Sequence, residues 1–207
     1  HRFKSLRGNE GWHHDSTYMP VAAKAGLLSA IEVPSTGGET ALADTRAGYD
    51  ALDNATRAAI AQLQAYHSLY ASQAKIGYKP ATGSGYGYGT QGAPLRSLVK
   101  VHPQTGRKAL CIGRHTFRIP GMSDADARVL LDDLLDRTCR PGLVYTHTWV
   151  PGDLLVWDNR CVMHRACAYD TNEPRVLQGT RIAGDPATES APTVADELAS
   201  GYVNTAT

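Results

Sequence analysis

Short runs of apolar, β-branched and aromatic residues recur along the chain, and segments with turn chemistry separate them. Such runs are typical of strands in a β protein. The separators include residues 34–38, 103–106 and 151–153, where Pro fixes φ and Gly permits positive φ, as tight antiparallel connections require. Strands are therefore predicted at residues 26–33, 39–44, 97–103, 108–113, 143–150, 153–159 and 175–184.

Two segments with helical periodicity interrupt these strands. The clearer one begins at Ser123, a predicted N-cap with Asp126 three residues on, and it ends before Pro141. Its apolar face consists of Ala127, Leu130, Leu131, Leu134 and Leu135. The other helix is broken near Asp53 and Asn54 and runs through Ile60 and Leu63. Both helices are predicted to pack over a sheet.

Many short strands and few helices predict a mainly β fold, an antiparallel sandwich or a rolled barrel with helices covering one face. With 207 residues and neither repeat nor linker, the chain is expected to form a single domain, residues 1–207. Residues 83–92, Gly-Ser-Gly-Tyr-Gly-Tyr-Gly-Thr-Gln-Gly, have the glycine spacing of a phosphate loop. No strand leads in and no helix follows, so we expect a mobile surface loop or an active-site lid.

Composition narrows the class of partner. The 21 Lys and Arg residues balance 20 Asp and Glu residues without a block of like charge, which argues against nucleic acid or anionic lipid. No apolar run is long enough for a membrane span, and the first residues lack the apolar core of a signal peptide, although the chain begins without Met. The four cysteines have neither metal nor disulfide spacing, which predicts reduced thiols and a cytoplasmic protein. A small molecule is the expected partner, and a homo-oligomer is compatible with this interpretation.

The segment His13-His14-Asp15 suggests a metal site. In an extended segment His13 and Asp15 point to the same face while His14 points away, although such a pair is also common without a metal. His164 is available as a distant partner, since it follows a strand that ends in Trp-Asp-Asn-Arg. Two histidines and one carboxylate suit non-haem Fe(II), and catalytic zinc uses the same ligand types.

Arg175 lies eleven residues after His164, on a strand whose alternation places it on one face with Leu177, Gly179 and Arg181. A buried arginine is costly unless it meets an anion, and its planar fork suits a carboxylate. Arg175 is therefore predicted to bind the far carboxylate of a metal-chelating keto acid. The alternative is an internal salt bridge.

Together with residues 37–44 and 102–110, these elements resemble the TauD/TfdA family of Fe(II)/2-oxoglutarate dioxygenases, from Asn9 to about Pro186. The resemblance implies a double-stranded β-helix, a jelly-roll barrel of the cupin type with flanking helices. It implies Fe(II), 2-oxoglutarate and O2 as cofactor and cosubstrates. The implied site residues are His13, Asp15 and His164 for the metal, Thr40, Trp149 and Arg175 for the cosubstrate, and Asn9 and Trp157 for the substrate pocket.

Within the family, the run 95–122 with 157–166 and 174–184 looks most like the aryloxyalkanoate branch, particularly the (S)-phenoxypropionate dioxygenases. Where the taurine enzyme has a sulfonate-binding arginine, fifteen residues after the distal histidine, this chain has Gly179. Glycine makes room for a bulky group, and Arg181 is then free to meet a substrate carboxylate or to form a salt bridge at the rim. Relative to the family, roughly the first third is expected to be missing.

The resulting hypothesis is hydroxylation of a small carboxylate substrate, an aryloxyalkanoate whose hydroxylated ether collapses to a phenol and an oxo acid. An alkylsulfatase- or sulfonate-type dioxygenase is the alternative with the same chemistry. A zinc hydrolase with the same three ligands, and a noncatalytic binding barrel, are the alternatives from other classes. The zinc hydrolase would work without oxygen and would leave Thr40 and Arg175 without a shared ligand.

Overall fold

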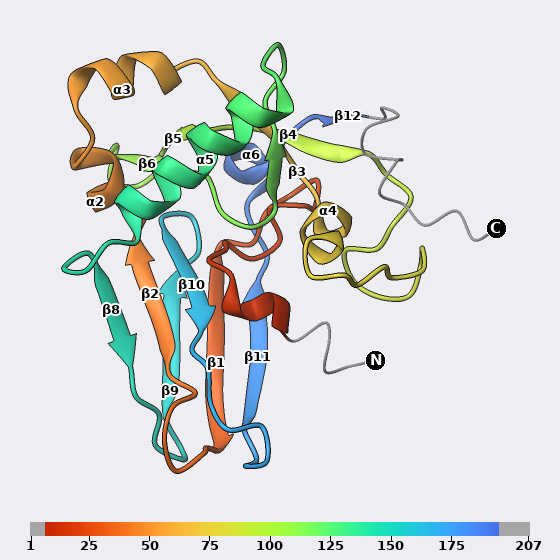
Figure 1. The fold of residues 1–207 in the computed structure, drawn as a ribbon, viewed down its shortest axis with the longest axis vertical. Coiled ribbons are helices and arrows are strands. Elements are labelled where there is room, and N and C mark those ends of the chain that lie inside the picture. The colour runs from red at the N-terminus through yellow and green to blue at the C-terminus, as the bar shows by residue number, and fades with distance from the viewer. Residues whose placement is uncertain (1–6, 195–207) are drawn as a thin grey trace.

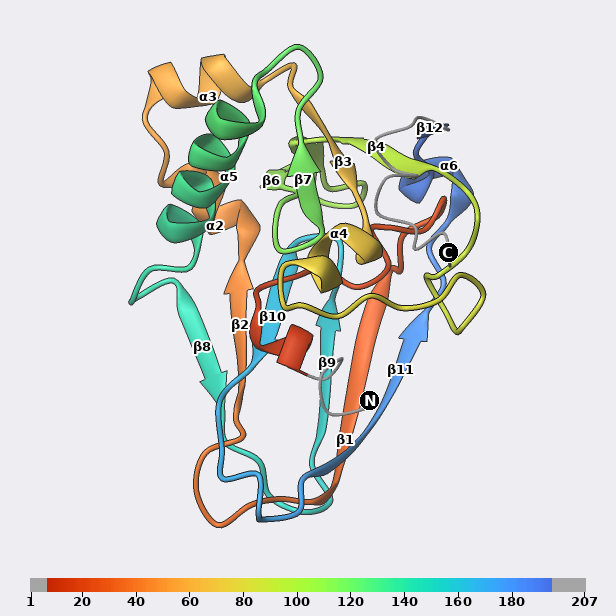
Figure 2. The same cartoon turned by 45° about the vertical axis from the view of Figure 1, so that its right-hand side comes forward.

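The computed structural model describes residues 7–194, and two three-stranded antiparallel sheets form the lower half of the molecule in Figures 1 and 2. One sheet has the order β11-β1-β9, and the other has the order β10-β2-β8. Their strands are β1 (Ala25–Glu32), β2 (Thr40–Asp44), β8 (Val144–His147), β9 (Leu154–Asp158), β10 (Val162–Ala166) and β11 (Val176–Ile182). The two sheets stand on opposite sides of the lower half in Figure 2.

The two sheets differ in burial. Four of the five residues of β2 are buried, whereas β11, at an edge, is exposed along most of its length. In the sheet register, β1 places Gly26 opposite Trp157 of β9, and Leu28 opposite Gly179 of β11. The site candidates Trp157, Gly179 and Arg181 therefore lie on the two strands that flank β1.

The upper part of the molecule holds a second layer of strands and the helices other than η1 (Figure 1). It contains a sheet of order β12-β4-β3-β7 and a β5-β6 pair. These strands are β3 (Gln64–His67), β4 (Ala93–Ser97), β5 (Val99–Val101), β6 (Lys108–Leu110), β7 (Thr116–Arg118) and β12 (Thr193–Val194). The helices are η1 (Arg7–Glu10), α2 (Thr45–Asp50), α3 (Asn54–Ile60), α4 (Leu69–Ala74), α5 (Asp124–Thr138) and α6 (Pro186–Glu189).

Helix α5 forms as its sequence predicts. The Ser123 side chain accepts a hydrogen bond from the Asp126 backbone N–H, which satisfies one of the free amides at the helix start. Ala127, Leu131 and Leu134 are buried and join the hydrophobic core, while the outer faces carry Asp and Arg. The helix ends at Thr138, ahead of Pro141.

Several local predictions were incomplete. The predicted strand 97–103 is divided, because the fully buried Leu98 bonds to Leu63 and to Cys111 between the ends of β4 and β5. The predicted helix through Leu63 is two helices, α2 and α3, and α3 stops at Ile60. Short elements β3, β7, β10, β12 and α4 lay outside the predicted elements.

The mainly β class is confirmed, while the strand pairings within residues 7–194 do not close into a single barrel. The four cysteines are free thiols, as expected. Among the described helices none is long and apolar enough to cross a membrane.

Candidate metal centre and cosubstrate site

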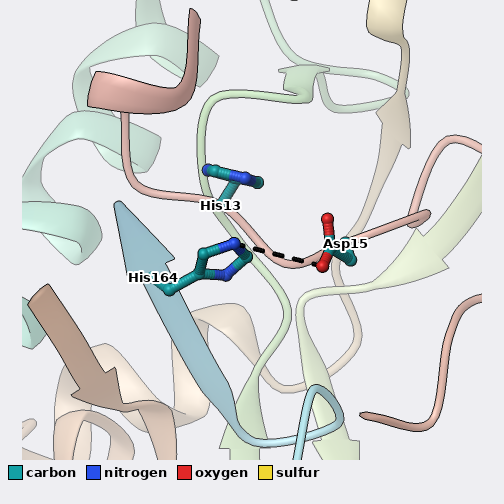
Figure 3. Close-up of side chains that lie close together, drawn as sticks. All are labelled: His13, Asp15 and His164. Carbon is teal, nitrogen blue, oxygen red and sulfur yellow. Dashed lines mark ion pairs between the residues drawn. The ribbon is translucent and has the colours of Figure 1, made fainter. Parts of the chain in front are cut away.

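His13, Asp15 and His164 converge on one point (Figure 3). Each is buried, with 6%, 7% and 8% of its surface exposed, and their candidate ligand atoms lie within 4.8 Å of one another. Nε2 of His164 lies 4.0 Å from Oδ2 of Asp15. A single cation placed between these three side chains would meet two imidazoles and one carboxylate.

Backbone pairing holds the two histidines side by side. His13 and His164 form an isolated antiparallel bridge, with N–O distances of 3.0 and 2.9 Å in the two directions. The predicted extended segment is limited to this bridge, because the chain turns at Asp15 and Ser16 has a φ of 60°. His14 points away from the centre, as predicted, and its Nδ1 donates to the Asn159 carbonyl at 2.8 Å.

The protonation states suit metal binding. Burial lowers the pKa of His13, and burial together with the nearby His13 lowers the pKa of His164 well below its ordinary value, so both rings are neutral at pH 7. Nδ1 of His13 donates to the Gly11 carbonyl at 2.7 Å, which leaves Nε2 as the free ligand atom. Burial opposes ionisation of Asp15, but the charge and hydrogen bond of Arg181 hold its pKa below the usual value.

These residues fit a divalent metal. Two neutral imidazoles and one ionised carboxylate are the ligand set of non-haem Fe(II) sites, and they also suit zinc. Within the described residues, Nδ1 of His164 is buried without a hydrogen-bond partner. The cluster is therefore incomplete as a purely internal hydrogen-bond network.

A second cluster of metal-ligand residue types consists of His102, Asp158 and Cys161. Unlike the first cluster, it is already complete as a hydrogen-bonded ion-pair network. His102 lies 3.0 Å from Asp158, and the guanidinium of Arg160 binds both carboxylate oxygens of Asp158 at 2.8 and 2.6 Å. The Asp158 carboxylate is thus already neutralised and hydrogen-bonded. This cluster is a charged network that fixes the turn between β9 and β10.

Thr40 and Trp149 are in direct contact. Nε1 of Trp149 donates to Oγ1 of Thr40 at 3.0 Å, and both residues are buried. Thr40 begins β2, the neighbour of the His164 strand, in which Ala166 pairs with it. The structure therefore places these two cosubstrate candidates together, Thr40 at the start of β2 and Trp149 two residues after the end of β8.

Arg175 lies beside the same sheet end. Its Nε donates to the Gly38 carbonyl at 2.8 Å, two residues before Thr40, and its guanidinium lies 5.7 Å from the Tyr169 ring centre. Burial lowers its pKa. It forms no salt bridge with a carboxylate of residues 7–194, so the alternative of an internal salt bridge is not observed there. A half-buried guanidinium in this situation can bind an anion.

Gly179 and Arg181 lie further along β11. A Cβ atom at Gly179 would lie 3.1 Å from the Leu28 side chain, so a larger residue at this position would press against Leu28. Nε of Arg181 is 3.0 Å from Oδ1 of Asp15, and its side chain is 45% exposed. The predicted rim salt bridge of Arg181 is thus a pair with a candidate metal ligand.

The loop of residues 83–92 lies next to this pair. The hydroxyl of Tyr86 donates to Oγ of Ser16 at 3.0 Å, and the Arg181 guanidinium lies 5.6 Å from the Tyr86 ring centre. Sequence reasoning treated the segment as a loop or lid and did not single out Tyr86. Tyr86 and Tyr88 stand between glycines in this loop, and these two large side chains were the only sequence signal that the loop contacts the site.

The remaining candidates differ in their surroundings. Trp157 is buried, and its ring lies 4.5 Å from that of His164, so it packs against a candidate ligand. A Cβ atom at Gly26 would lie 2.2 Å from this indole, which explains glycine opposite Trp157. Asn9 is exposed on η1, and its role in a substrate pocket stays a prediction.

A cavity of about 350 Å³ lies behind the segment that carries His13 and Asp15. His14 and Asn159 line it, and neither His13, Asp15 nor His164 does. Glu189 and Lys100, which form an ion pair, lie on its wall. The cavity is therefore separate from the cluster of candidate ligands.

The comparisons with known proteins agree with this arrangement. Residues 2–181 match the family described as "Taurine catabolism dioxygenase TauD, TfdA family". The (S)-phenoxypropionate/alpha-ketoglutarate-dioxygenase of Sphingobium herbicidovorans is 53% identical over 192 residues, 91% of this chain and 67% of that protein. The enzyme of the same name from Delftia acidovorans is 52% identical over 191 residues, 91% of this chain and 65% of that protein.

Among solved structures, AAD-2 in complex with Mn(II) and N-oxalylglycine superposes with a TM-score of 0.82 at 40% identity, covering 92% of this chain and 73% of that one. The chain spans about two thirds of the length of the curated relatives that it matches.

Proposed function

Because the chain belongs to the TauD/TfdA family, we propose that it is an Fe(II)- and 2-oxoglutarate-dependent dioxygenase that hydroxylates a small carboxylate substrate. The observation that carries the proposal is the buried His13, Asp15 and His164 cluster. The same ligand types are used by non-haem iron enzymes, in which the unoccupied coordination positions are left for cosubstrate and oxygen.

We assign the metal to His13, Asp15 and His164. Bound iron would supply oxygen activation coupled to the oxidative decarboxylation of 2-oxoglutarate to succinate and carbon dioxide. Arg175 provides the charged fork for the far carboxylate of 2-oxoglutarate, and Thr40, held by Trp149, provides a hydroxyl beside it. The contact of Arg175 with Gly38 supports this assignment, since it places the guanidinium next to the residues that lead into Thr40.

We propose an aryloxyalkanoate, of the phenoxypropionate type, as the substrate. Arg181, which pairs with Asp15 and has a side chain that is 45% exposed, is the candidate for its carboxylate, and the lack of a side chain at Gly179 is the candidate feature for accommodating an aromatic ring. Hydroxylation of the carbon that bears the ether oxygen replaces C–H by C–OH, and the resulting hemiketal or hemiacetal collapses to a phenol and an oxo acid. The protein's contribution is to fix the position of this carbon. The names of the two relatives support the substrate class.

We further propose that the two three-stranded sheets belong to a double-stranded β-helix within one domain, residues 1–207, of which 1–6 and 195–207 lie outside the described part. The superposition on AAD-2 supports this fold. A cytoplasmic location, supported by the free cysteines, remains a prediction. Assembly into a homo-oligomer is equally open to test, and five exposed apolar residues on β1, β9 and β11 support it: Ile31, Leu154, Val156, Val176 and Ile182.

The experiment is an assay of succinate formation from 2-oxoglutarate with Fe(II) and oxygen. The substrates are (S)- and (R)-phenoxypropionate, phenoxyacetate, taurine and an alkyl sulfate. We expect succinate matched by phenol release with a phenoxypropionate. Succinate formed with taurine or the sulfate alone would reject the aryloxyalkanoate substrate and favour the alternative dioxygenase. Turnover without oxygen would reject the dioxygenase and favour a zinc hydrolase.

A further inference from the structure

Asn159 lies in the turn between β9 and β10, and its side chain hydrogen-bonds to both backbone polar groups of Asp15. Its Oδ1 accepts from the Asp15 N–H at 2.7 Å, and its Nδ2 donates to the Asp15 carbonyl at 2.9 Å. The second hydrogen of Nδ2 goes to the Ala23 carbonyl at 2.8 Å. The side chain is 3% exposed, so these bonds form away from bulk water.

The amide therefore acts as a neighbouring strand would, with one donor and one acceptor for the same residue. Asp15 needs such a partner because the chain turns there and the backbone bridge to β10 is limited to His13. A buried backbone N–H or C=O without a partner is costly, so the turn depends on this side chain.

Asn159 is also connected to the other ligands. Its carbonyl accepts from Nδ1 of His14, which follows His13 directly. Five residues later the same chain segment supplies His164 from β10. The turn itself is held by Asp158, which accepts from the backbone N–H and the guanidinium of Arg160. One residue thus links the segments that carry all three candidate ligands.

We propose that Asn159 is the positioning residue of the metal centre: its amide fixes the backbone of Asp15 and so directs the carboxylate toward His13 and His164. It touches no reacting atom. Groups of this kind, which orient the ligands, typically change metal affinity by about 10- to 100-fold when removed. The inference rests on the proposed function for the presence of a metal at this cluster.

The test compares Asn159→Ala and Asn159→Asp with the unaltered chain in Mn(II) titrations followed by electron paramagnetic resonance, without 2-oxoglutarate or substrate. Asn159→Asp keeps the shape and the acceptor for the Asp15 N–H, but it replaces the donor by an oxygen that faces two carbonyls. We expect the Kd for Mn(II) to rise by about 10-fold or more in both variants. The visible absorption spectrum of bound Co(II) should change as well, since the ligand geometry changes.

Thr138→Val is the matched control. Thr138 is fully buried and its hydroxyl donates to the Leu134 carbonyl at 2.7 Å, at the end of α5. Its loss should lower the thermal midpoint without altering Mn(II) affinity. Asn159 variants with a Kd within twofold of the unaltered chain and the same Co(II) spectrum would overturn the positioning role alone. An equal loss of affinity in Thr138→Val would also overturn it. An unaltered chain that binds no Mn(II) would overturn the proposed function together with this inference.

Discussion

The two sides of the candidate site differ in how firmly they are held. On one side the three candidate ligands are at most 8% exposed, and backbone bonds and Asn159 determine their positions. On the other side, β11 is an exposed edge strand, and the Arg181 side chain is 45% exposed. The positions of the candidate ligands are thus fixed by buried contacts, while the proposed substrate contacts lie on a strand with fewer neighbours.

This difference suggests a division of labour. Replacing a group on the buried side should affect metal binding and every substrate alike, because the ligands share one hydrogen-bond network. Replacing Arg175, which directly precedes β11, or Gly179 on β11 should change cosubstrate or substrate affinity and leave the metal in place.

The largest effect is expected for His13→Ala and Asp15→Ala. Each variant loses one of three ligands, so Mn(II) binding and succinate formation should both be abolished. His14→Gln is the control from the same segment, since His14 points away from the cluster. It should retain measurable metal binding and turnover. Succinate formation at the unaltered rate in pure His13→Ala or Asp15→Ala would contradict the ligand assignment.

Arg175→Ala should come next. It removes the only charge that we assign to the far carboxylate of 2-oxoglutarate, and losing one partner of a buried charge pair costs at least about 2 kcal/mol. We expect the KM for 2-oxoglutarate to rise by about 30-fold or more, with Mn(II) affinity within twofold of the unaltered chain. Arg175→Lys keeps the charge without the planar fork, so its KM for 2-oxoglutarate should lie between those of the unaltered chain and Arg175→Ala. An unchanged KM for 2-oxoglutarate, measured by succinate release, would show that Arg175 does not bind the cosubstrate.

Gly179→Arg should change selectivity more than it changes catalysis. The new side chain begins 3.1 Å from the Leu28 side chain and adds a bulky charged group where we propose that the aromatic ring binds. We expect kcat/KM for a phenoxypropionate to fall by about 10-fold or more, the usual cost of altering the shape of a pocket. Succinate formation uncoupled from substrate should continue. Equal kcat/KM values for both chains would show that the aromatic ring binds elsewhere.

Two of the three candidate ligands, His13 and Asp15, could be predicted from a local signal, whereas His164 was assigned from the segment before it and from the family resemblance. Side chains two apart in an extended segment share a face, and this alone separated His13 and Asp15 from His14. Helix α5 was predicted for the same reason, since its cap and its periodicity lie within one segment.

The contacts that complete the site could not be predicted, because they join residues far apart in the chain. Asn159 meets Asp15 across 144 positions, and nothing near either residue indicates it. The pair between Arg181 and Asp15 depends on how β11 lies beside β1 and on the turn at Ser16. The division of strand 97–103 has a similar cause, because Leu98 takes bonding partners from two distant segments.

The last effect concerns acid stability and the buried layer above the site. His67 is 1% exposed, and neither ring nitrogen has a hydrogen-bond partner within residues 7–194. Burial, with smaller contributions from Arg96 and His14, holds its pKa well below 6.5. Below pH 6.5 the unfolded chain therefore binds a proton that the folded chain does not, and stability falls as the pH falls, by about 1.4 kcal/mol per pH unit for one such group.

His67→Phe removes this proton while keeping a ring of similar size in the core. When the pH is lowered from 7.5 to 5, the difference in unfolding free energy between the variant and the unaltered chain should therefore shift by about 2 kcal/mol in favour of the variant. Urea unfolding of the metal-free proteins at both pH values measures this difference, and Thr138→Val should show the same offset at both, because it removes no titratable group. A His67→Phe offset that does not change with pH would mean that His67 has the same pKa in the folded and the unfolded chain, as when the fold admits water to its ring. That outcome would show that the buried layer around the site is less tightly closed than the ligand side of the comparison requires.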